Sequence, residues 1–154
     1  MEVTIVSADI RGFTQLSSMM TLDDVTDMLG AYLTRLVPTV SSYGGYIDKC
    51  IGDQLLCVFD QETQYMDAIE VALEMQRIMR QVNAQRLDEG KHIGQLGIGI
   101  HAGEVVRGFV GSKHRMEYTI IGDAVNRACR YGDGVGPGAI LISPAVFAKA
   151  WDRV

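Results

Sequence analysis

Apolar residues follow two different spacings along the chain. Residues 3–8 are almost continuously apolar or β-branched, which predicts a short buried strand. From residue 25 to residue 40 the apolar side chains recur three or four positions apart, as on the buried face of a helix. Thr21 is placed to cap the start of that helix, with Asp24 three residues later, and Gly44-Gly45 marks its end.

The same two spacings divide the rest of the chain into strands and helices. The second long helix is predicted to turn five residues toward the core: Ile69, Ala72, Leu73, Met79 and Val82. In chain order, the predicted elements are strands at 46–50 and 54–59, the long helix at 65–87, a second strand pair at 96–100 and 105–110, an extended segment at 116–121, a helix capped by Asp123 that runs to about Tyr131, a strand at 140–142 and a short helix from Ser143-Pro144.

The order of the first six elements is β-α-β-β-α-β, the ferredoxin-like plan, so we predict an α+β fold. The later segments add an extended arm, a helix and a strand to this core. In the ferredoxin-like plan the third strand pairs with the second and lies antiparallel beside the first. The end of the first strand and the start of the third therefore share one edge of the sheet, where we expect Asp9 and Asp53 to meet.

Composition narrows the class of protein. The chain has 154 residues, 47% of them hydrophobic, which suits a single domain over 1–154. No apolar run is long enough to cross a bilayer, so we expect no membrane contact from this segment. A net charge of −5 argues against a nucleic-acid-binding protein. Cys50, Cys57 and Cys129 are odd in number and lie among apolar residues, which predicts reduced core thiols in a cytoplasmic protein and no zinc site.

Two aspartates at one sheet edge suggest a site for a pair of divalent cations. Mg²⁺ and Mn²⁺ prefer oxygen ligands, and Mg²⁺ is commonly held by one or two carboxylates together with substrate phosphates. Either aspartate alone is more simply explained as a turn residue, so the prediction depends on the pairing of Asp9 with Asp53. The turn Ile10-Arg11-Gly12-Phe13-Thr14 leads into a helix, and its backbone N–H groups suit a triphosphate.

Asn126 and Arg130 lie four residues apart on a predicted helix and therefore share a face. A guanidinium group can stabilise charge that develops on a phosphorus atom, and an amide can orient a ribose. Taken alone, the two residues are better explained as part of a solvated helix face. His101 could act as a general base, but it follows a strand in a structural block, and we favour a structural role for it.

Four blocks of the sequence resemble the class III adenylyl/guanylyl cyclase catalytic domain. In order they read SADIRGFT at 7–14, DKCIGD at 48–53, GIGIHAGEVV at 97–106 and YTIIGDAVNRACR at 118–130. The resemblance runs from about residue 3 to about residue 143. It implies an enzyme that forms a 3′,5′-cyclic nucleotide and pyrophosphate. The ribose 3′-oxygen attacks the α-phosphate in line, and two Mg²⁺ or Mn²⁺ ions assist.

The resemblance also implies a role for each candidate residue, and all of these positions hold functional residue types. The implied assignments are Asp9, Ile10 and Asp53 for the metal ions; residues 10–14 for the triphosphate (Ile10, Arg11, Gly12, Phe13 and Thr14); Lys49 and Thr119 for the purine; Asn126 for the ribose; and Arg130 for the pentavalent phosphorus.

The residues at the two purine positions favour ATP as the substrate. Adenine offers an acceptor at N1 and a donor at N6, which a lysine and a threonine hydroxyl can satisfy. Guanine reverses this pattern, and guanylyl members of the family carry a glutamate where this chain has Lys49. Thr119, in place of the commoner aspartate, resembles the branch called class IIIb. Some members of that branch respond to bicarbonate, so bicarbonate regulation is a further hypothesis.

In the family that the sequence resembles, the site lies between two chains. One chain supplies the aspartate pair and the other supplies the lysine, threonine, asparagine and arginine. This sequence holds both sets, which implies a head-to-tail homodimer with two equivalent sites. The segment 112–120 resembles the arm that reaches across the dimer. The family's domain usually continues into another strand pair with a basic residue for the triphosphate, so we expect this chain, which ends at Val154, to be truncated at its C-terminus.

Three other functions stay open from the sequence. A guanylyl cyclase would share the fold and the metal pair but use GTP. A diguanylate cyclase is disfavoured, because those enzymes show a G-G-[DE]-E-F turn and here Gly44-Gly45 is followed by Tyr46-Ile47-Asp48. A catalytically silent module that binds a nucleotide or only dimerises is disfavoured by the complete set of functional residues.

Overall fold

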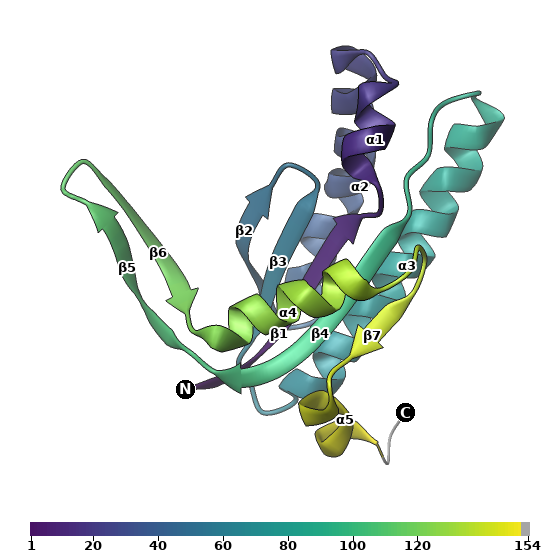
Figure 1. The fold of residues 1–154 in the computed structure, drawn as a ribbon. Helices are drawn as coiled ribbons and strands as arrows, with labels where there is room; N and C mark the ends of the chain where they lie inside the picture. Colours follow the sequence, from purple (N-terminus) through teal and green to yellow (C-terminus); the bar gives the residue numbers. More distant parts are fainter. Residues whose placement is uncertain (152–154) are drawn as a thin grey trace.

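Seven strands and five helices follow one another along residues 1–151, the part of the chain that the computed structural model describes (Figure 1). They are β1 (Glu2–Ile10), α1 (Phe13–Ser18), α2 (Leu22–Ser42), β2 (Tyr46–Ile51), β3 (Gln54–Phe59), α3 (Gln64–Asp88), β4 (Leu96–Glu104), β5 (Val106–Ser112), β6 (Arg115–Ile121), α4 (Asp123–Gly134), β7 (Ile140–Ile142) and α5 (Pro144–Ala150).

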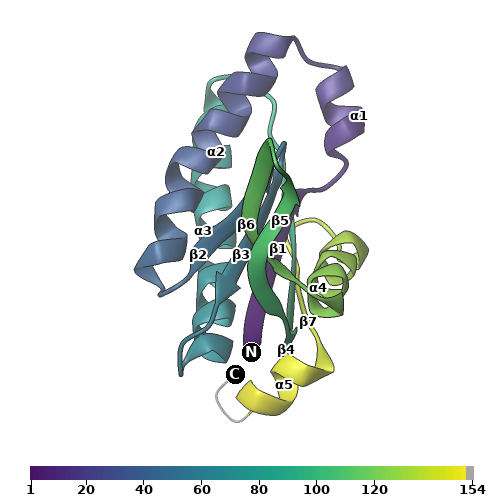
Figure 2. The same cartoon turned by 90° about the vertical axis from the view of Figure 1, so that its left-hand side faces the viewer.

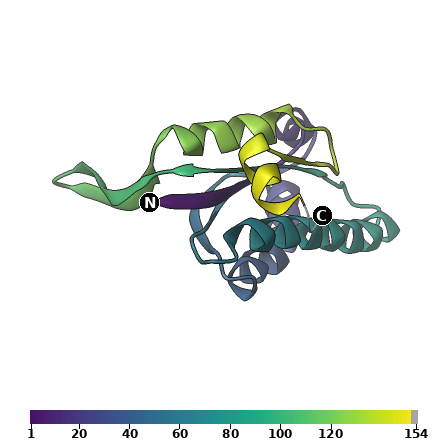
Figure 3. The same cartoon turned by 90° about the horizontal axis from the view of Figure 1, so that it is seen from below.

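A five-stranded sheet in the order β2-β3-β1-β4-β7 forms the centre of the fold. Strand β1 is antiparallel to both of its neighbours, β3 and β4, and β7 runs parallel to β4 at the edge. Helices α2 and α3 cover one face of the sheet, and α4 lies on the other (Figure 3). This arrangement confirms the predicted ferredoxin-like α+β fold with an added arm, helix and strand.

The two faces of the sheet bury separate sets of side chains. Successive residues of a strand point to opposite faces. In β1, Val6 and Ala8 pack on the side of α2 and α3, whereas Val3 and Ile5 pack on the side of α4. In α2, on the first of these sides, the buried residues recur at every fourth position: Met28, Tyr32, Leu36 and Val40.

No helix within residues 1–151 combines the length and the apolar character needed to cross a membrane.

One predicted helix cap, Thr21, and one predicted helix start, at Ser143-Pro144, are confirmed. The Thr21 hydroxyl accepts a hydrogen bond from the backbone N–H of Asp24 at 3.1 Å, at the start of α2. The Ser143 hydroxyl accepts one from the backbone N–H of Val146 at the start of α5. Such bonds satisfy backbone groups that have no partner within a helix, so both helices begin where the sequence indicates.

Helix α4 packs directly against the backbone of β4. A Cβ atom added to Gly99 would lie 2.2 Å from the backbone nitrogen of Gly132 and 2.6 Å from the carbonyl carbon of Tyr131. Because the overlapping atoms of α4 belong to its backbone, no change of side-chain rotamer can relieve the overlap with this Cβ atom. Glycine at position 99 therefore sets how closely α4, which carries Asn126 and Arg130, approaches the sheet.

The prediction that 96–100 and 105–110 pair with each other is wrong. Strand β4 pairs with β1 and β7 in the central sheet, whereas β5 pairs with β6 in a separate hairpin. This hairpin, residues 106–121, projects away from the sheet and is called the arm below (Figure 1). The reason is burial. Residues 96–102 are buried and belong inside the fold, whereas most of the arm is exposed and finds only its own partner strand.

Three smaller predictions are also corrected. Leu73 is 57% exposed, because it lies at the outer edge of the apolar stripe of α3. Gly122 rather than Asp123 is the N-cap of α4, and the Asp123 carboxylate instead binds Arg127 one turn later. All three cysteines are free, but Cys57 alone is a buried core thiol and Cys50 is exposed.

Replacing Gly99 by alanine tests how α4 is seated. We expect Gly99→Ala to lower the free energy of unfolding by about 2–3 kcal/mol, since the added methyl overlaps the backbone of α4. Urea denaturation followed by circular dichroism measures the change. Gly134→Ala, at the end of the same helix, is the matched control, because nothing lies within 4 Å of its added Cβ. It should change the stability by less than about 0.5 kcal/mol. Equal stabilities of the two variants would contradict this close packing.

Candidate functional site

Asp9 and Asp53 meet at one edge of the sheet, as the fold prediction requires. Asp9 is the penultimate residue of β1, and Asp53 directly precedes β3 in the turn that follows Gly52. Gly52 has a φ of 58°, a left-handed conformation that glycine adopts without strain. This turn places the Asp53 carboxylate where Oδ2 accepts a hydrogen bond from the backbone N–H of Ile10 at 2.9 Å.

The Asp9 carboxylate is held in an unfavourable environment. Its side chain is only 14% exposed, and Oδ1 is buried with no hydrogen-bond partner within residues 1–151. Arg11 Nε lies 3.7 Å from Oδ1, beyond hydrogen-bond length. Burial raises the pKa of Asp9 to about 6, the charges of Asp133 and Asp53 add to the rise, and Arg11 opposes it.

A buried carboxylate oxygen without a partner costs free energy unless a positive charge or a proton compensates it. A divalent cation suits this position, because a second carboxylate lies beside it and hard cations prefer oxygen ligands. Within residues 1–151 no group of three or more His, Cys, Asp or Glu side chains is arranged to hold a metal. A cation bound here would therefore need oxygen atoms from a ligand or water in addition to Asp9 and Asp53.

The turn that follows Asp9 is tied to two other segments. The backbone N–H of Arg11 donates to the Gln95 carbonyl at 2.8 Å. The Arg11 guanidinium donates from Nη1 to the carbonyl oxygens of Gly132 at 2.6 Å and Asp133 at 2.9 Å, at the end of α4. The backbone N–H of Arg11 thus joins the turn to Gln95, and Nη1 joins it to the end of α4.

Three of the residues predicted for the triphosphate follow Arg11. Gly12 has a φ of 66° and precedes α1 without any side-chain cap. The backbone N–H groups of Gly12, Phe13 and Thr14 make no backbone hydrogen bond within the described residues. These amides are therefore groups of this turn that remain for an anion.

The two predicted purine positions are brought together from β2 and β6. Lys49 Nζ donates to Thr119 Oγ1 at 2.9 Å. The Thr119 hydroxyl lies 2.7 Å from Asp48 Oδ2, and the backbone N–H of Ile120 donates to Asp48 Oδ1 at 3.3 Å. Asp48 received no role from the sequence, since neighbouring residues of a regular strand point to opposite faces.

Asn126 and Arg130 lie on the exposed side of α4. The Arg130 side chain is 69% exposed, and its Nη2 lies 3.8 Å from Asp123 Oδ1. No hydrogen bond or ion pair joins either residue to Asp9 or Asp53 among the described residues. In the single chain the aspartate pair and the α4 pair are therefore not in direct polar contact.

His101 has a structural environment, as favoured from the sequence. Its Nδ1 lies 2.9 Å from Ser143 Oγ, the hydroxyl that caps α5, and its ring lies 5.7 Å from the ring of Tyr131. Burial, followed by the charge of Arg127, lowers the pKa of His101 below its usual value. The ring thus supports the start of α5, and the lowered pKa favours its neutral form.

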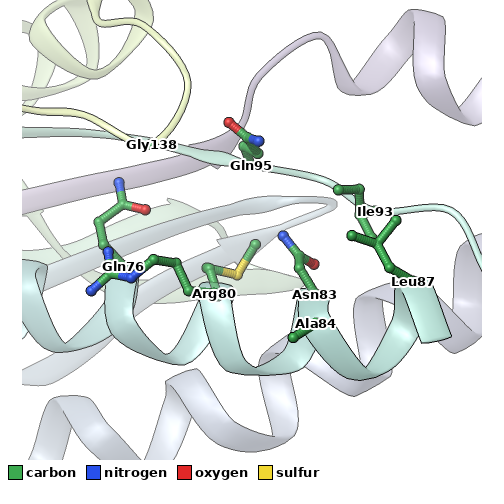
Figure 4. A pocket seen from close by; sticks show the side chains of 9 residues that line it. Gln76, Arg80, Asn83, Ala84, Leu87, Ile93, Gln95 and Gly138 are labelled. Atoms are coloured by element: carbon green, nitrogen blue, oxygen red, sulfur yellow. The ribbon is translucent and has the colours of Figure 1, made fainter.

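A cavity of about 440 Å³ lies beside α3, and none of the predicted site residues lines it (Figure 4). Two of its polar side chains are hydrogen-bonded inside the fold: Gln76 donates to the Leu96 carbonyl at 3.0 Å, and Asn83 donates to the Gly94 carbonyl at 2.7 Å. These bonds hold the segment before β4 in place. Nothing in this cavity resembles the aspartate pair or the Lys49–Thr119 contact.

Sequence comparison relates this chain to one family. A family profile described as "Adenylate and Guanylate cyclase catalytic domain" matches residues 1–150. The chain is 37% identical over 129 residues to "Adenylate cyclase, terminal-differentiation specific" of Dictyostelium discoideum, and 38% identical over 132 residues to an adenylate cyclase of Anabaena cylindrica. Each match covers 83% of this chain, which spans only 6% and 26% of the length of these relatives.

Solved structures give the same result for the fold. The guanylyl cyclase Cya2 matches with a TM-score of 0.93 and 34% identity, over 100% of this chain and 80% of that chain. The adenylyl cyclase CyaB from P. aeruginosa matches with a TM-score of 0.93 and 31% identity, over 99% and 81%. The same fold thus occurs in proteins named for different nucleotides.

Replacing Asp9 by asparagine tests the environment of this carboxylate. The folded-state pKa of Asp9 is raised from 3.8 to about 6, so wild type loses stability relative to Asp9→Asn as the pH rises through this window. In metal-free protein at pH 7, the variant should melt roughly 3 °C or more above wild type. Excess Mn²⁺ should then raise the melting temperature of wild type only. A stability difference that does not change between pH 4 and pH 7 would contradict the raised pKa.

Proposed function

Because the chain belongs to the class III adenylyl/guanylyl cyclase catalytic domain family, we propose that it converts ATP to 3′,5′-cyclic AMP and pyrophosphate. The observation that carries the choice of ATP is the 2.9 Å contact between Lys49 and Thr119. Lys49 offers a donor to adenine N1, and the Thr119 oxygen offers an acceptor to the 6-amino group. Guanine carries an N–H at N1 and a carbonyl at C6, so it mismatches both.

Asp9 and Asp53 are the proposed ligands of two divalent cations, Mg²⁺ or Mn²⁺, together with the backbone of Ile10. Support comes from the buried, unpartnered Oδ1 of Asp9 and from the position of Asp53 beside it. When bound, such ions supply Lewis-acid chemistry that activates the ribose 3′-hydroxyl and neutralises the phosphates.

The remaining chemistry is positioning and charge stabilisation. The backbone N–H groups of Gly12, Phe13 and Thr14 are proposed to bind the triphosphate, Asn126 to orient the ribose and Arg130 to stabilise the charge on the phosphorus. The ribose 3′-hydroxyl gives up its proton to solvent as its oxygen attacks the α-phosphorus in line, the bond between the α-phosphorus and the oxygen bridging to the β-phosphate breaks, and pyrophosphate leaves. No side-chain nucleophile takes part, which agrees with the structural environment of His101.

We propose that the complete site forms between two copies of the chain in a head-to-tail dimer. One chain supplies Asp9 and Asp53, and the partner copy supplies the purine pair together with Asn126 and Arg130. The exposure of Arg130 in the single chain, 69%, fits a side chain that acts on another molecule. A closed dimer of this kind has two equivalent sites.

The arm, residues 106–121, is the proposed contact between the copies (Figure 2). Large apolar side chains on the arm stay exposed in the single chain, although the rings of Phe109 and Tyr118 lie against each other. Val106 and Phe109 are each 69% exposed, and Met116 and Tyr118 are 57% and 55% exposed. Apolar patches of this kind mark interaction surfaces. The arm projects from the sheet, so a second copy can cover it (Figure 1).

The proposal predicts cyclic AMP from ATP and little cyclic GMP from GTP when the chain is incubated with Mn²⁺ at high protein concentration. Asp53→Asn should reduce the rate at least about 100-fold, because the isosteric amide removes a metal-binding charge. Both cyclic products are quantified in one assay. Predominant cyclic GMP would favour the guanylyl cyclase alternative, and no product with either nucleotide would favour a silent binding or dimerisation module.

Mixing two inactive variants tests the shared site. Asp53→Asn lacks the metal half and Arg130→Ala lacks the half supplied by α4, so each alone should be nearly inactive. In an equal mixture half of the dimers are mixed, and each contains one intact site of two. Activity should therefore return to about a quarter of wild type. If the mixture stays as inactive as its components, then the two halves do not come from different chains.

A further inference from the structure

Strand β2 contains an irregularity at Asp48. Ile47 pairs with Cys57 and Lys49 pairs with Leu56, so Asp48 is an extra residue without a partner in β3. Side chains of neighbouring strand residues normally point to opposite faces, and a bulge can change the direction of one of them. Here both Asp48 and Lys49 contact the same residue, Thr119.

The Asp48 carboxylate uses each of its oxygen atoms for a separate purpose. Its side chain is only 3% exposed. Oδ1 accepts the backbone N–H of Ile120 at 3.3 Å, and Oδ2 accepts the Thr119 hydroxyl at 2.7 Å. Lys49 Nζ, 3.6 Å from Oδ2, supplies the opposite charge that a buried carboxylate requires.

The chemistry of these groups fixes the direction of the Thr119 hydroxyl. Lys49 has only donors, and an ionised Asp48 has only acceptors. The single hydroxyl proton of Thr119 therefore goes to Asp48, and its oxygen accepts from Lys49. The Ile120 carbonyl is a competing acceptor at 3.4 Å, but the shorter, charge-assisted bond to Asp48 is stronger. What Thr119 can still offer to a ligand is a lone pair.

We infer that Asp48 is a positioning residue that holds Thr119 as a hydrogen-bond acceptor and so selects a purine with an amino group at C6. This inference depends on the proposed function, in which Thr119 faces the purine. Asp48 does not touch the nucleotide. It acts through Thr119, whose outward lone pair accepts from a 6-amino group and repels a 6-carbonyl.

Asp48→Asn should remove this acceptor. The backbone N–H of Ile120 needs an acceptor, so the amide oxygen must occupy the Oδ1 position. The amide NH₂ then faces Thr119 and donates to its oxygen. With Lys49 and the amide both donating to this oxygen, its two lone pairs are used, and the hydroxyl proton turns either to the Ile120 carbonyl at 3.4 Å or toward the ligand. In either case Thr119 has no lone pair left for the 6-amino group.

The experiment compares ATP with purine riboside 5′-triphosphate, which keeps N1 but lacks the 6-amino group. The ratio of kcat/KM for ATP to kcat/KM for this analogue measures recognition at position 6 alone. We expect wild type to prefer ATP, and Asp48→Asn to lower that preference by roughly tenfold, the value of one hydrogen bond. In a Thr119→Val background, Asp48→Asn should leave the ratio unchanged.

Asp60→Asn is the matched control, because Asp60 also anchors the base of the arm. Its Oδ2 accepts from Arg107 on β5 at 2.9 Å, as Asp48 accepts from β6. A variant that only loosens the arm should slow both nucleotides equally and leave their ratio unchanged. If Asp48→Asn behaves in this way, then Asp48 only anchors the arm and the inference is overturned.

The experiment distinguishes failure of the proposed function from failure of the inference alone. If wild type makes no cyclic AMP, the proposed function fails and the inference fails with it, whereas an active wild type with an unchanged ratio in Asp48→Asn overturns the inference alone. Thermal melting checks that each variant folds. If Asp48→Asn does not fold, Asp48→Ala replaces it. The preference for ATP should then fall by a smaller factor, because no amide occupies the second lone pair of Thr119, and an unchanged preference would again overturn the inference.

Discussion

The antiparallel pairing of β1 with β3 is the constraint on which the site depends. It brings the end of one strand to the start of the other, so that Asp53 can bind the backbone N–H of Ile10 next to Asp9. Because β1 is hydrogen-bonded on both sides and buried along most of its length, the fold can hold a poorly solvated carboxylate there. A site that destabilises the metal-free protein is typical of function rather than of packing.

Arg11 connects this edge to the rest of the molecule. Its guanidinium binds carbonyl oxygens at the end of α4, and α4 lies against β4 through Gly99. The turn after Asp9 and the helix that carries Asn126 and Arg130 are therefore parts of one rigid unit. In a dimer with two shared sites, the exposed face of α4 would supply Asn126 and Arg130 to one site. The end of α4, bound by Arg11, would hold the turn after Asp9 in place at the other site.

Strand order and the meeting of Asp9 with Asp53 could be predicted from the sequence, because alternation of elements fixes the ferredoxin-like topology. The sequence could not predict that β5 leaves the central sheet, because the apolar residues of β5 resemble those of a buried strand. They are exposed in the arm, and Phe109 is an example at 69%. The role of Asp48 was also hidden, because it depends on an irregularity in β2 that no sequence pattern indicates.

We propose, centrally, that this cyclase domain works as an adenylyl cyclase with sites shared between two copies. The most direct test is the rate of cyclic AMP formation per chain, measured with ATP and Mn²⁺ over a wide range of protein concentration. The rate per chain should rise with concentration and then level off as the dimer fills. A rate per chain that stays constant down to concentrations at which the protein is monomeric would contradict the claim.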